Sequence, residues 1–144
     1  MKNTSTGIVN LHKSKTKHFL CKARINGVQA RLLIDTGASN SCLNQGDQQK
    51  FLLEVEGQPF EAAGAAEGKL HAVNSAESRL NLGRYAAGTH AFVLLDMTHI
   101  NITLQSQGAK PIDGILGADF FFQRNVQIDY LNRKMIFEIE SSRH

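Results

Sequence analysis

The dipeptide Asn26-Gly27 constrains the fold of this chain most strongly, because it lies between two short runs of β-type residues. These runs cover residues 18–24 and 28–34. Asn-Gly is the strongest local signal for a two-residue hairpin turn, since both residues tolerate the positive φ angles that the turn requires. The sequence therefore predicts a β-hairpin near the start of the folded domain.

The second run of this hairpin leads directly into an aspartate. Residues 32–39 read Leu-Leu-Ile-Asp-Thr-Gly-Ala-Ser, so Asp35 follows three large apolar residues. A carboxylate beside a core costs free energy unless hydrogen bonds hold it. Gly37 permits a tight turn, and the small residues after it leave space around the carboxylate. We therefore expect Asp35 at a strand-to-loop transition where backbone amides can hold it.

The composition is that of one globular domain. The chain has 144 residues, of which 42% are hydrophobic and 20% are charged, and this is sufficient for a single core. No apolar window approaches the roughly 20 residues of a membrane span, and no apolar leader follows the first residues. We expect a cytoplasmic chain without a membrane segment.

Cys21 and Cys42 are expected to be reduced, because two cysteines make no disulfide framework.

Basic residues are concentrated before and within the first run. Residues 12–18 read His-Lys-Ser-Lys-Thr-Lys-His, and Lys22 and Arg24 follow. A solvated terminus is the simpler interpretation, and contact with nucleic acid or another anionic surface is the alternative. Because no aromatic residues interleave with the first cluster, we do not expect nucleic acid as a partner. We assign residues 1–17 to a basic arm that can be mobile, 18–140 to the folded domain and 141–144 to a C-terminal tail.

The rest of the chain is predicted to be mostly β, with one or two short helices. Residues 44–55 favour a short helix with Asn44 as its cap. Another short helix is expected at residues 118–123. The remaining β stretches are predicted around residues 70–82, 90–95 and on both sides of a turn at residues 131–133, with a further turn at residues 82–85.

Residues 57–69 are rich in glycine and alanine and contain few residues that could anchor them in a core. One interpretation is a surface loop. The other is a hairpin lid, or flap, carried by residues 58–71 and able to bend over a ligand. The flap candidates are Ala63, Gly64 and Ala65.

Two segments together resemble a known family. Residues 33–39, Leu-Ile-Asp-Thr-Gly-Ala-Ser, are similar to the active-site signature of the aspartic proteases. Residues 112–120, Ile-Asp-Gly-Ile-Leu-Gly-Ala-Asp-Phe, resemble the segment that packs behind the catalytic loop in the retropepsin-like branch. The resemblance spans residues 19–139 and implies a single-lobe, closed, barrel-like β fold. It also implies a catalytic role for Asp35, support from Thr36, Gly37 and Ala38, and packing behind the site by Ile115, Leu116 and Gly117.

The resemblance implies an aspartic endopeptidase that needs no metal or cofactor. Two aspartates held close together share one proton, so one accepts a proton from water while the other donates to the scissile carbonyl. The chain offers one usable aspartate. No glycine follows Asp96, which we interpret as a polar residue at a strand end, and Asp113 is interpreted as loop structure. A C2 homodimer that joins two Asp35 carboxylates is therefore implied, with an extended peptide or protein segment as substrate.

Two features separate this chain from the typical retroviral pattern. Retroviral members commonly carry an arginine and an acidic partner where this sequence has Ala118 and Ser39. This difference favours a cellular or bacterial relative. The alternative function is a dimeric peptide-binding or assembly module that keeps the fold without turnover.

Overall fold

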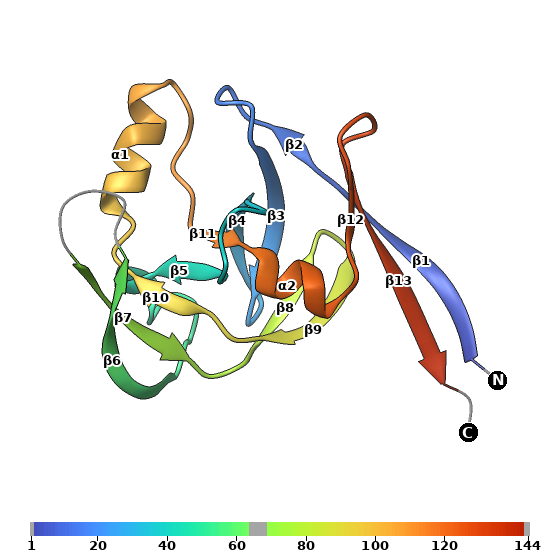
Figure 1. The fold of residues 1–144 in the computed structure, drawn as a ribbon, viewed down its shortest axis with the longest axis horizontal. Helices are drawn as coiled ribbons and strands as arrows, with labels where there is room; N and C mark the ends of the chain where they lie inside the picture. Colours follow the sequence, from blue (N-terminus) through green and yellow to red (C-terminus); the bar gives the residue numbers. More distant parts are fainter. Residues whose placement is uncertain (1, 64–68, 143–144) are drawn as a thin grey trace.

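The computed structural model describes residues 2–63 and 69–142, and it describes side chains over residues 7–62 and 71–138. The described residues form two β-sheets and two short α-helices (Figure 1). The strands are β1 (Lys2–Asn10), β2 (His12–Lys13), β3 (Phe19–Ile25), β4 (Val28–Ile34), β5 (Cys42–Asn44), β6 (Val55–Ala63), β7 (Lys69–Ser75), β8 (Ser78–Leu82), β9 (Tyr85–His90), β10 (Val93–Leu95), β11 (Gly114–Leu116), β12 (Gln127–Asp129) and β13 (Lys134–Ser142). The helices are α1 (Thr98–Ser106), α2 (Ala118–Gln123) and a 3-10 helix at Gln45–Asp47.

The fold class is mostly β, as the sequence predicts. The larger sheet has the strand order β6-β7-β10-β5-β11-β4-β3-β8-β9, with β2 also paired to β3. This sheet is not closed, which corrects the expectation of a closed barrel. Its β9 end is covered instead by side chains of the three-stranded sheet β1-β13-β12, where Tyr85 stacks on Phe137 with ring centroids 4.3 Å apart.

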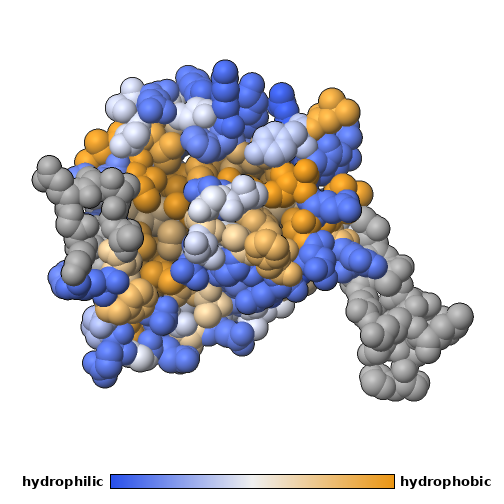
Figure 2. All heavy atoms as spheres, in the orientation of Figure 1, coloured by the Kyte–Doolittle hydropathy of each residue, from blue (hydrophilic) through white to orange (hydrophobic). Residues whose placement is uncertain are grey.

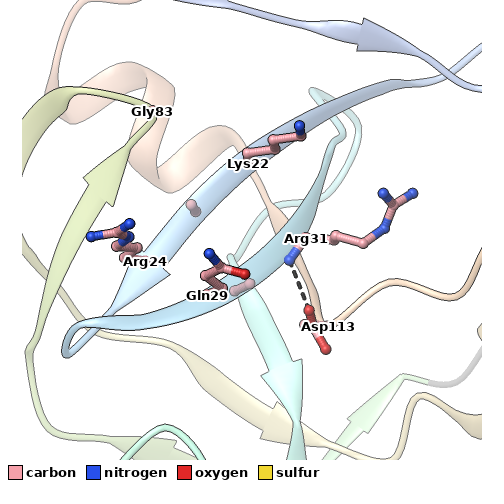
Figure 3. Close-up of a pocket in the computed structure, with 8 residues that line it drawn as sticks. Lys22, Arg24, Gln29, Arg31, Gly83 and Asp113 are labelled. Carbon is pink, nitrogen blue, oxygen red and sulfur yellow. Dashed lines mark hydrogen bonds between the residues drawn. The ribbon is translucent and has the colours of Figure 1, made fainter.

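The predicted hairpin is present as β3 and β4. Its turn residues Asn26 and Gly27 have φ angles of 49° and 84°, so both occupy the left-handed region that the Asn-Gly pair favours. The Asn26 side chain donates to the Phe51 carbonyl at 2.8 Å and accepts from the Arg79 amide at 3.1 Å, which ties the turn to two other segments. Figure 3 shows the polar outer face of this hairpin.

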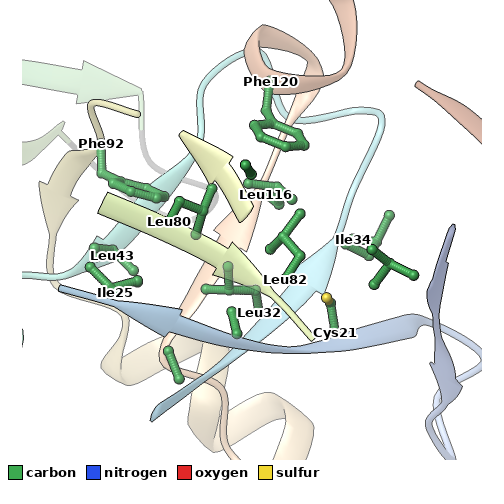
Figure 4. Packing of buried hydrophobic residues seen from close by; sticks show 14 of the residues in the cluster. Cys21, Ile25, Leu32, Ile34, Leu43, Leu80, Leu82, Phe92, Leu116 and Phe120 are labelled. Atoms are coloured by element: carbon green, nitrogen blue, oxygen red, sulfur yellow. The ribbon is translucent and has the colours of Figure 1, made fainter. Parts of the chain in front are cut away.

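Two cores lie on opposite faces of β4. Leu32 and Ile34 belong to the main core, which also contains Leu116 and Phe120 (Figure 4). Leu33 points to the other face and joins a second core beneath α1. A strand that is buried on both faces has consecutive apolar residues in its sequence, which explains the Leu-Leu-Ile run before Asp35.

The helix predicted for residues 44–55 is wrong. These residues contain the end of β5, the short 3-10 helix and a series of turns. Phe51 and Leu53 are both buried, whereas Leu52 between them is exposed and has a φ of 56°. In a regular helix residues 51 and 53 would point in different directions, so the burial of both disfavours a helix, and tertiary packing overrides the local helical preference.

The structure also contains a helix that the sequence analysis did not predict, α1. Its β-branched residues Thr98, Ile100 and Thr103 lower helix propensity. The helix forms because Leu104 is buried and Ile100 packs on the second core, which also holds Met97 from the residue before the helix. The predicted helix at residues 118–123 and the strands around residues 131–133 are confirmed as α2, β12 and β13.

The N-terminal residues belong to both sheets. β1 pairs with β13 in antiparallel register from Lys2 opposite Ser142 to Asn10 opposite Lys134, and β2 pairs with β3. The stretch interpreted as an arm thus carries two strands. The domain boundaries themselves remain a prediction.

The described parts of residues 57–69 lie in two strands. β6 and β7 pair in antiparallel register at one end of the larger sheet, which agrees with the hairpin of the second interpretation, and its role as a flap stays a prediction. A register shift between Glu56 and Phe60, with Gly57 at a φ of 80°, marks a bulge in β6. Figure 2 shows apolar side chains on the molecular surface over the area between this hairpin and α1.

Candidate active site

Asp35 is placed by the centre of the larger sheet. It follows β4 directly, and β4 lies between β3 and β11. The parallel pairing of β4 with β11 ends with Ile34 opposite Leu116, and the Asp35 amide then donates to the Leu116 carbonyl at 3.0 Å. The backbone of Asp35 is thus held as a continuation of a central strand.

The carboxylate of Asp35 is held by its own loop. The Gly37 amide donates to Asp35 Oδ1 at 3.0 Å, and the Ala38 amide donates to the Asp35 carbonyl at 3.2 Å. Asp35 is half-buried, whereas Thr36 and Gly37 are exposed. A Cβ on residue 37 would lie 3.3 Å from Asp35 Oδ1, so the glycine gives the carboxylate close access to the backbone.

The second motif packs directly behind this loop. A Cβ on Gly117 would lie 2.7 Å from the Ala38 carbonyl oxygen, so no larger residue fits without a shift of the backbone. The Ala118 amide donates to that same carbonyl at 2.7 Å, and the Asp119 amide donates to the Ser39 carbonyl at 3.2 Å. The three residues expected to pack behind the site, Ile115, Leu116 and Gly117, are all buried.

A polar cluster beside this loop was not anticipated from the sequence. Ser41 is fully buried, and both its amide and its hydroxyl donate to Asp119 Oδ1, at 2.9 Å and 2.7 Å. The Ser41 oxygen accepts from the Gly117 amide at 2.9 Å, and His90 Nε2 lies 3.0 Å from Asp119 Oδ2. These residues are far apart in the chain, and no local pattern marks them as a group.

The charges of this cluster follow from its burial. Burial lowers the pKa of His90, although the neighbouring Asp119 carboxylate opposes that shift. Burial of Asp119 disfavours its ionisation, but hydrogen bonds from Ser41 and the proximity of His90 hold its pKa below the usual value. At neutral pH the pair is therefore a neutral imidazole that donates from Nε2 to a carboxylate. The His90 ring also packs edge-on against Phe92 and Phe120.

Asp96 and Asp113, the other aspartates considered from the sequence, form hydrogen bonds within their own parts of the fold. Asp96 Oδ1 accepts hydrogen bonds from the amide and hydroxyl of Thr98 at the start of α1. These bonds hold the pKa of Asp96 below its usual value. Asp113 Oδ2 accepts from the Arg31 amide at 2.7 Å, and Asp113 Oδ1 lies 3.6 Å from Lys50 Nζ.

Both cysteines are buried and free, as expected for reduced thiols. Burial raises the pKa of Cys21 to about 12. Burial likewise raises the pKa of Cys42 to about 11, with further contributions from Asp119 and Asp35. Neither thiol is a nucleophile at neutral pH, because the thiolate is the reactive form.

The flap candidates are only partly within the described structure. Ala63 ends β6, while Gly64 and Ala65 lie outside the described residues. Across the described residues, no group of three or more His, Cys, Asp or Glu side chains is placed to hold a metal ion. No helix in residues 2–63 and 69–142 is long and apolar enough to cross a membrane.

Comparisons with known proteins agree with this arrangement. The family model described as aspartyl protease matches residues 21–120. A retropepsin-like aspartic protease from Rickettsia conorii has a similar structure, with a TM-score of 0.57, 16% identity, and coverage of 99% of this chain and 97% of that chain. The retroviral protease-like domain of Ddi1 from Leishmania major gives a TM-score of 0.53 and 20% identity, covering 78% of this chain and 81% of that chain.

A search of curated protein sequences found no significant match. The structural similarities establish the fold. The family model covers the Asp35 loop and the segment behind it from β11 to Phe120 in α2. The chain therefore belongs to the aspartyl protease family and has a retropepsin-like fold.

Proposed function

We propose that this chain is an aspartic endopeptidase that hydrolyses peptide bonds when two copies bring their Asp35 side chains together. The observation that carries this proposal is the position of Asp35. Its backbone continues a central strand, its carboxylate is only half-buried, and the next two residues are exposed. A second copy and a substrate can therefore both approach the carboxylate.

The second carboxylate is proposed to come from a partner copy because the candidate aspartates within one chain already have other roles. Asp96 accepts two hydrogen bonds at α1, Asp113 binds the Arg31 amide, and Asp119 binds Ser41 and His90. A symmetric dimer supplies the second carboxylate through a single interface, because each residue at a two-fold axis faces its own copy.

The reaction follows from two carboxylates that share one proton. Two like charges in close contact cannot both ionise, so one Asp35 remains protonated. The ionised carboxylate accepts a proton from water, and the oxygen of that water bonds to the scissile carbonyl carbon. The protonated carboxylate donates its proton to the carbonyl oxygen. When the resulting diol collapses, the C–N bond breaks and the nitrogen leaves with a proton from the dyad.

The proposed substrate is an extended peptide that lies beneath the β6–β7 hairpin. The hairpin stands at one end of the larger sheet, and apolar surface is exposed beside it (Figure 2). An extended peptide in such a place is recognised mainly through its main chain, while pockets receive alternate side chains. The flap residues around Ala63 are proposed to close over it.

The proposal is tested by cleavage of a peptide library at acidic to neutral pH. Wild type is compared with Asp35→Asn and with Asp96→Asn, which makes the same chemical change at an exposed aspartate outside the proposed site. Sedimentation of each protein measures the dimer. We expect cleavage by wild type and Asp96→Asn but not by Asp35→Asn. Cleavage by Asp35→Asn, or by a monomer, contradicts the mechanism, and binding of peptides without cleavage by wild type favours the binding module.

A further inference from the structure

The outer face of the β3–β4 hairpin contains two adjoining cavities. The first has a volume of about 510 Å³ and is lined by Lys22, Arg24 and Arg31 among others (Figure 3). The second has a volume of about 390 Å³ and is lined by residues that include Lys13 and Lys110. Lys22 and Arg31 line both cavities, so the two adjoin at these side chains, and we call them together the basic groove.

The basic groove gathers positive charge that its own carboxylate does not neutralise. Among the residues that the structure describes, Asp113 is the one acidic side chain that lines it, and the oxygens of this carboxylate already face the Arg31 amide and Lys50. The described residues provide no salt-bridge partner for any of the groove's lysine and arginine side chains. The groove holds six of the chain's 16 lysine and arginine residues, namely Lys13, Lys15, Lys22, Arg24, Arg31 and Lys110.

The strand register places two of these charges against each other. Lys22 on β3 is the direct cross-strand partner of Arg31 on β4. Like charges that face each other across neighbouring strands destabilise a sheet. The pairing therefore disfavours the free protein, and a bound anion between the two side chains relieves the repulsion.

Both edges of β3, the strand at the centre of the groove, are occupied by other segments of the described structure. One edge of β3 is paired with β4 along its whole length, and the other is paired with β2 at Phe19 and Leu20 and with β8 from Ala23 to Ile25. Between these two pairings, the Lys22 carbonyl accepts from the Gly83 amide at 2.8 Å. Recognition along β3 can therefore use side-chain charge, but not strand addition.

The lining residues also define which polyanion fits. Among the described residues, no phenylalanine, tyrosine or tryptophan lines either cavity, and the imidazole of His12 is the one ring there, so bases have little surface on which to stack. Lysine and arginine side chains bind phosphate oxygens without regard to sequence. We propose that the basic groove binds nucleic acid through its phosphate backbone, without base recognition. This inference does not depend on the proposed peptidase activity.

The test measures binding of a labelled RNA oligonucleotide longer than about 16 nucleotides, the upper site size of single-strand binding folds, by fluorescence anisotropy. The proteins are the full chain, the double variant Lys22→Gln/Arg31→Gln, and the matched control Arg133→Gln/Lys134→Gln. The control removes the same charge at the β12–β13 turn, and its residues do not line either cavity. The Asp35→Asn chain is measured in parallel, so that loss of proteolysis and loss of binding are separated.

We expect wild-type affinity to fall more than about tenfold between about 50 and 200 mM salt. The groove variant should bind RNA at least about tenfold more weakly at low salt. The slope of log affinity against log salt should be less steep by about 1.4, because each of the two lost phosphate contacts contributes about 0.7 on a single strand. The control and Asp35→Asn should bind within about twofold of wild type. Equal melting temperatures confirm that the variants fold.

Three results overturn the proposal. The first is an equal loss of affinity in the groove variant and the control, which indicates nonspecific attraction. The second is displacement of the RNA by a polyglutamate peptide as efficiently as by unlabelled RNA, which identifies an acidic protein surface as the partner. The third is displacement by inorganic phosphate at matched ionic strength, which identifies a site for a free anion.

Discussion

The buried hydroxyl of Ser41 donates to the carboxylate of Asp119 at 2.7 Å and thereby joins the Asp35 loop to α2. The same Ser41 oxygen accepts from the Gly117 amide, so one side chain connects both halves of the candidate site. Removing it should affect stability more than removing an ordinary exposed hydroxyl, because a buried donor would lose its partner.

Replacement of Ser41 by alanine should lower the free energy of unfolding by about 1–3 kcal/mol, since the Gly117 amide would be left unsatisfied in the core. Urea denaturation measures this change. The control is Ser106→Ala, which removes an exposed hydroxyl bonded to the Thr103 carbonyl and should cost less than about 0.5 kcal/mol. Equal effects of the two substitutions would show that the Ser41 bond does not stabilise the loop.

Replacement of Gly117 by alanine should displace the Asp35 loop, because the new Cβ would lie 2.7 Å from the Ala38 carbonyl oxygen. We expect a loss of about 1–3 kcal/mol in the free energy of unfolding, together with loss of peptide cleavage. Gly46→Ala is the matched control, since the nearest atom to its Cβ is 4.0 Å away. Wild-type cleavage by Gly117→Ala would mean that this close contact does not position Asp35.

The His90–Asp119 pair should make the fold less stable as the pH falls below 6.5, the usual pKa of a histidine. His90 has a lowered pKa in the folded protein, so the unfolded state binds more protons and stability is lost from about pH 6.5 down to the folded-state value. Asp119, whose pKa is also lowered, adds a further loss below its usual value of 3.8. Melting temperatures measured from neutral to acidic pH should show both falls.

A histidine variant can show whether His90 causes the first of these two losses of stability. His90→Gln should reduce the fall between about pH 6.5 and 5, because it removes the buried imidazole that must become charged. His71→Gln, at an exposed histidine of β7, should leave it unchanged. If His90→Gln keeps the full fall, another group is responsible for it.

A dimeric site predicts a characteristic result for mixed chains. When wild type and Asp35→Asn are combined in equal amounts and allowed to exchange, random pairing leaves about one quarter of the dimers with two Asp35 residues. Cleavage per total chain should therefore fall to about one quarter of the wild-type value. A fall only to one half would show that each chain acts independently, and this would contradict the shared dyad.

Much of the site was predictable because its signals are local. The Asn26-Gly27 turn and the apolar run before Asp35 depend on residues that are close in the chain. Gly114 and Gly117, by contrast, belong to the segment that resembles the family's second motif, and their close contacts are with residues 32–43. The structure places these elements as expected, with Asp35 at the end of β4 and Gly117 against its loop. Residues 44–55 and α1 differ from the structure that local propensity predicts, because burial of Phe51 and Leu53 in one case and of Leu104 in the other outweighs that propensity.

The sequence by itself determined where the candidate carboxylate stands, since turn chemistry and hydrophobic pattern act between residues that are close in the chain. Only the tertiary structure decided what surrounds it. The Ser41–Asp119–His90 cluster joins three segments, and the basic groove gathers β2, the β3–β4 hairpin and the chain around Lys110. The basic stretch near the N-terminus predicted no nucleic-acid contact when read alone. The fold brings Lys13 and Lys15 to the same cavity as Lys22 and Arg31. Charges act through distance in space and not through separation in sequence.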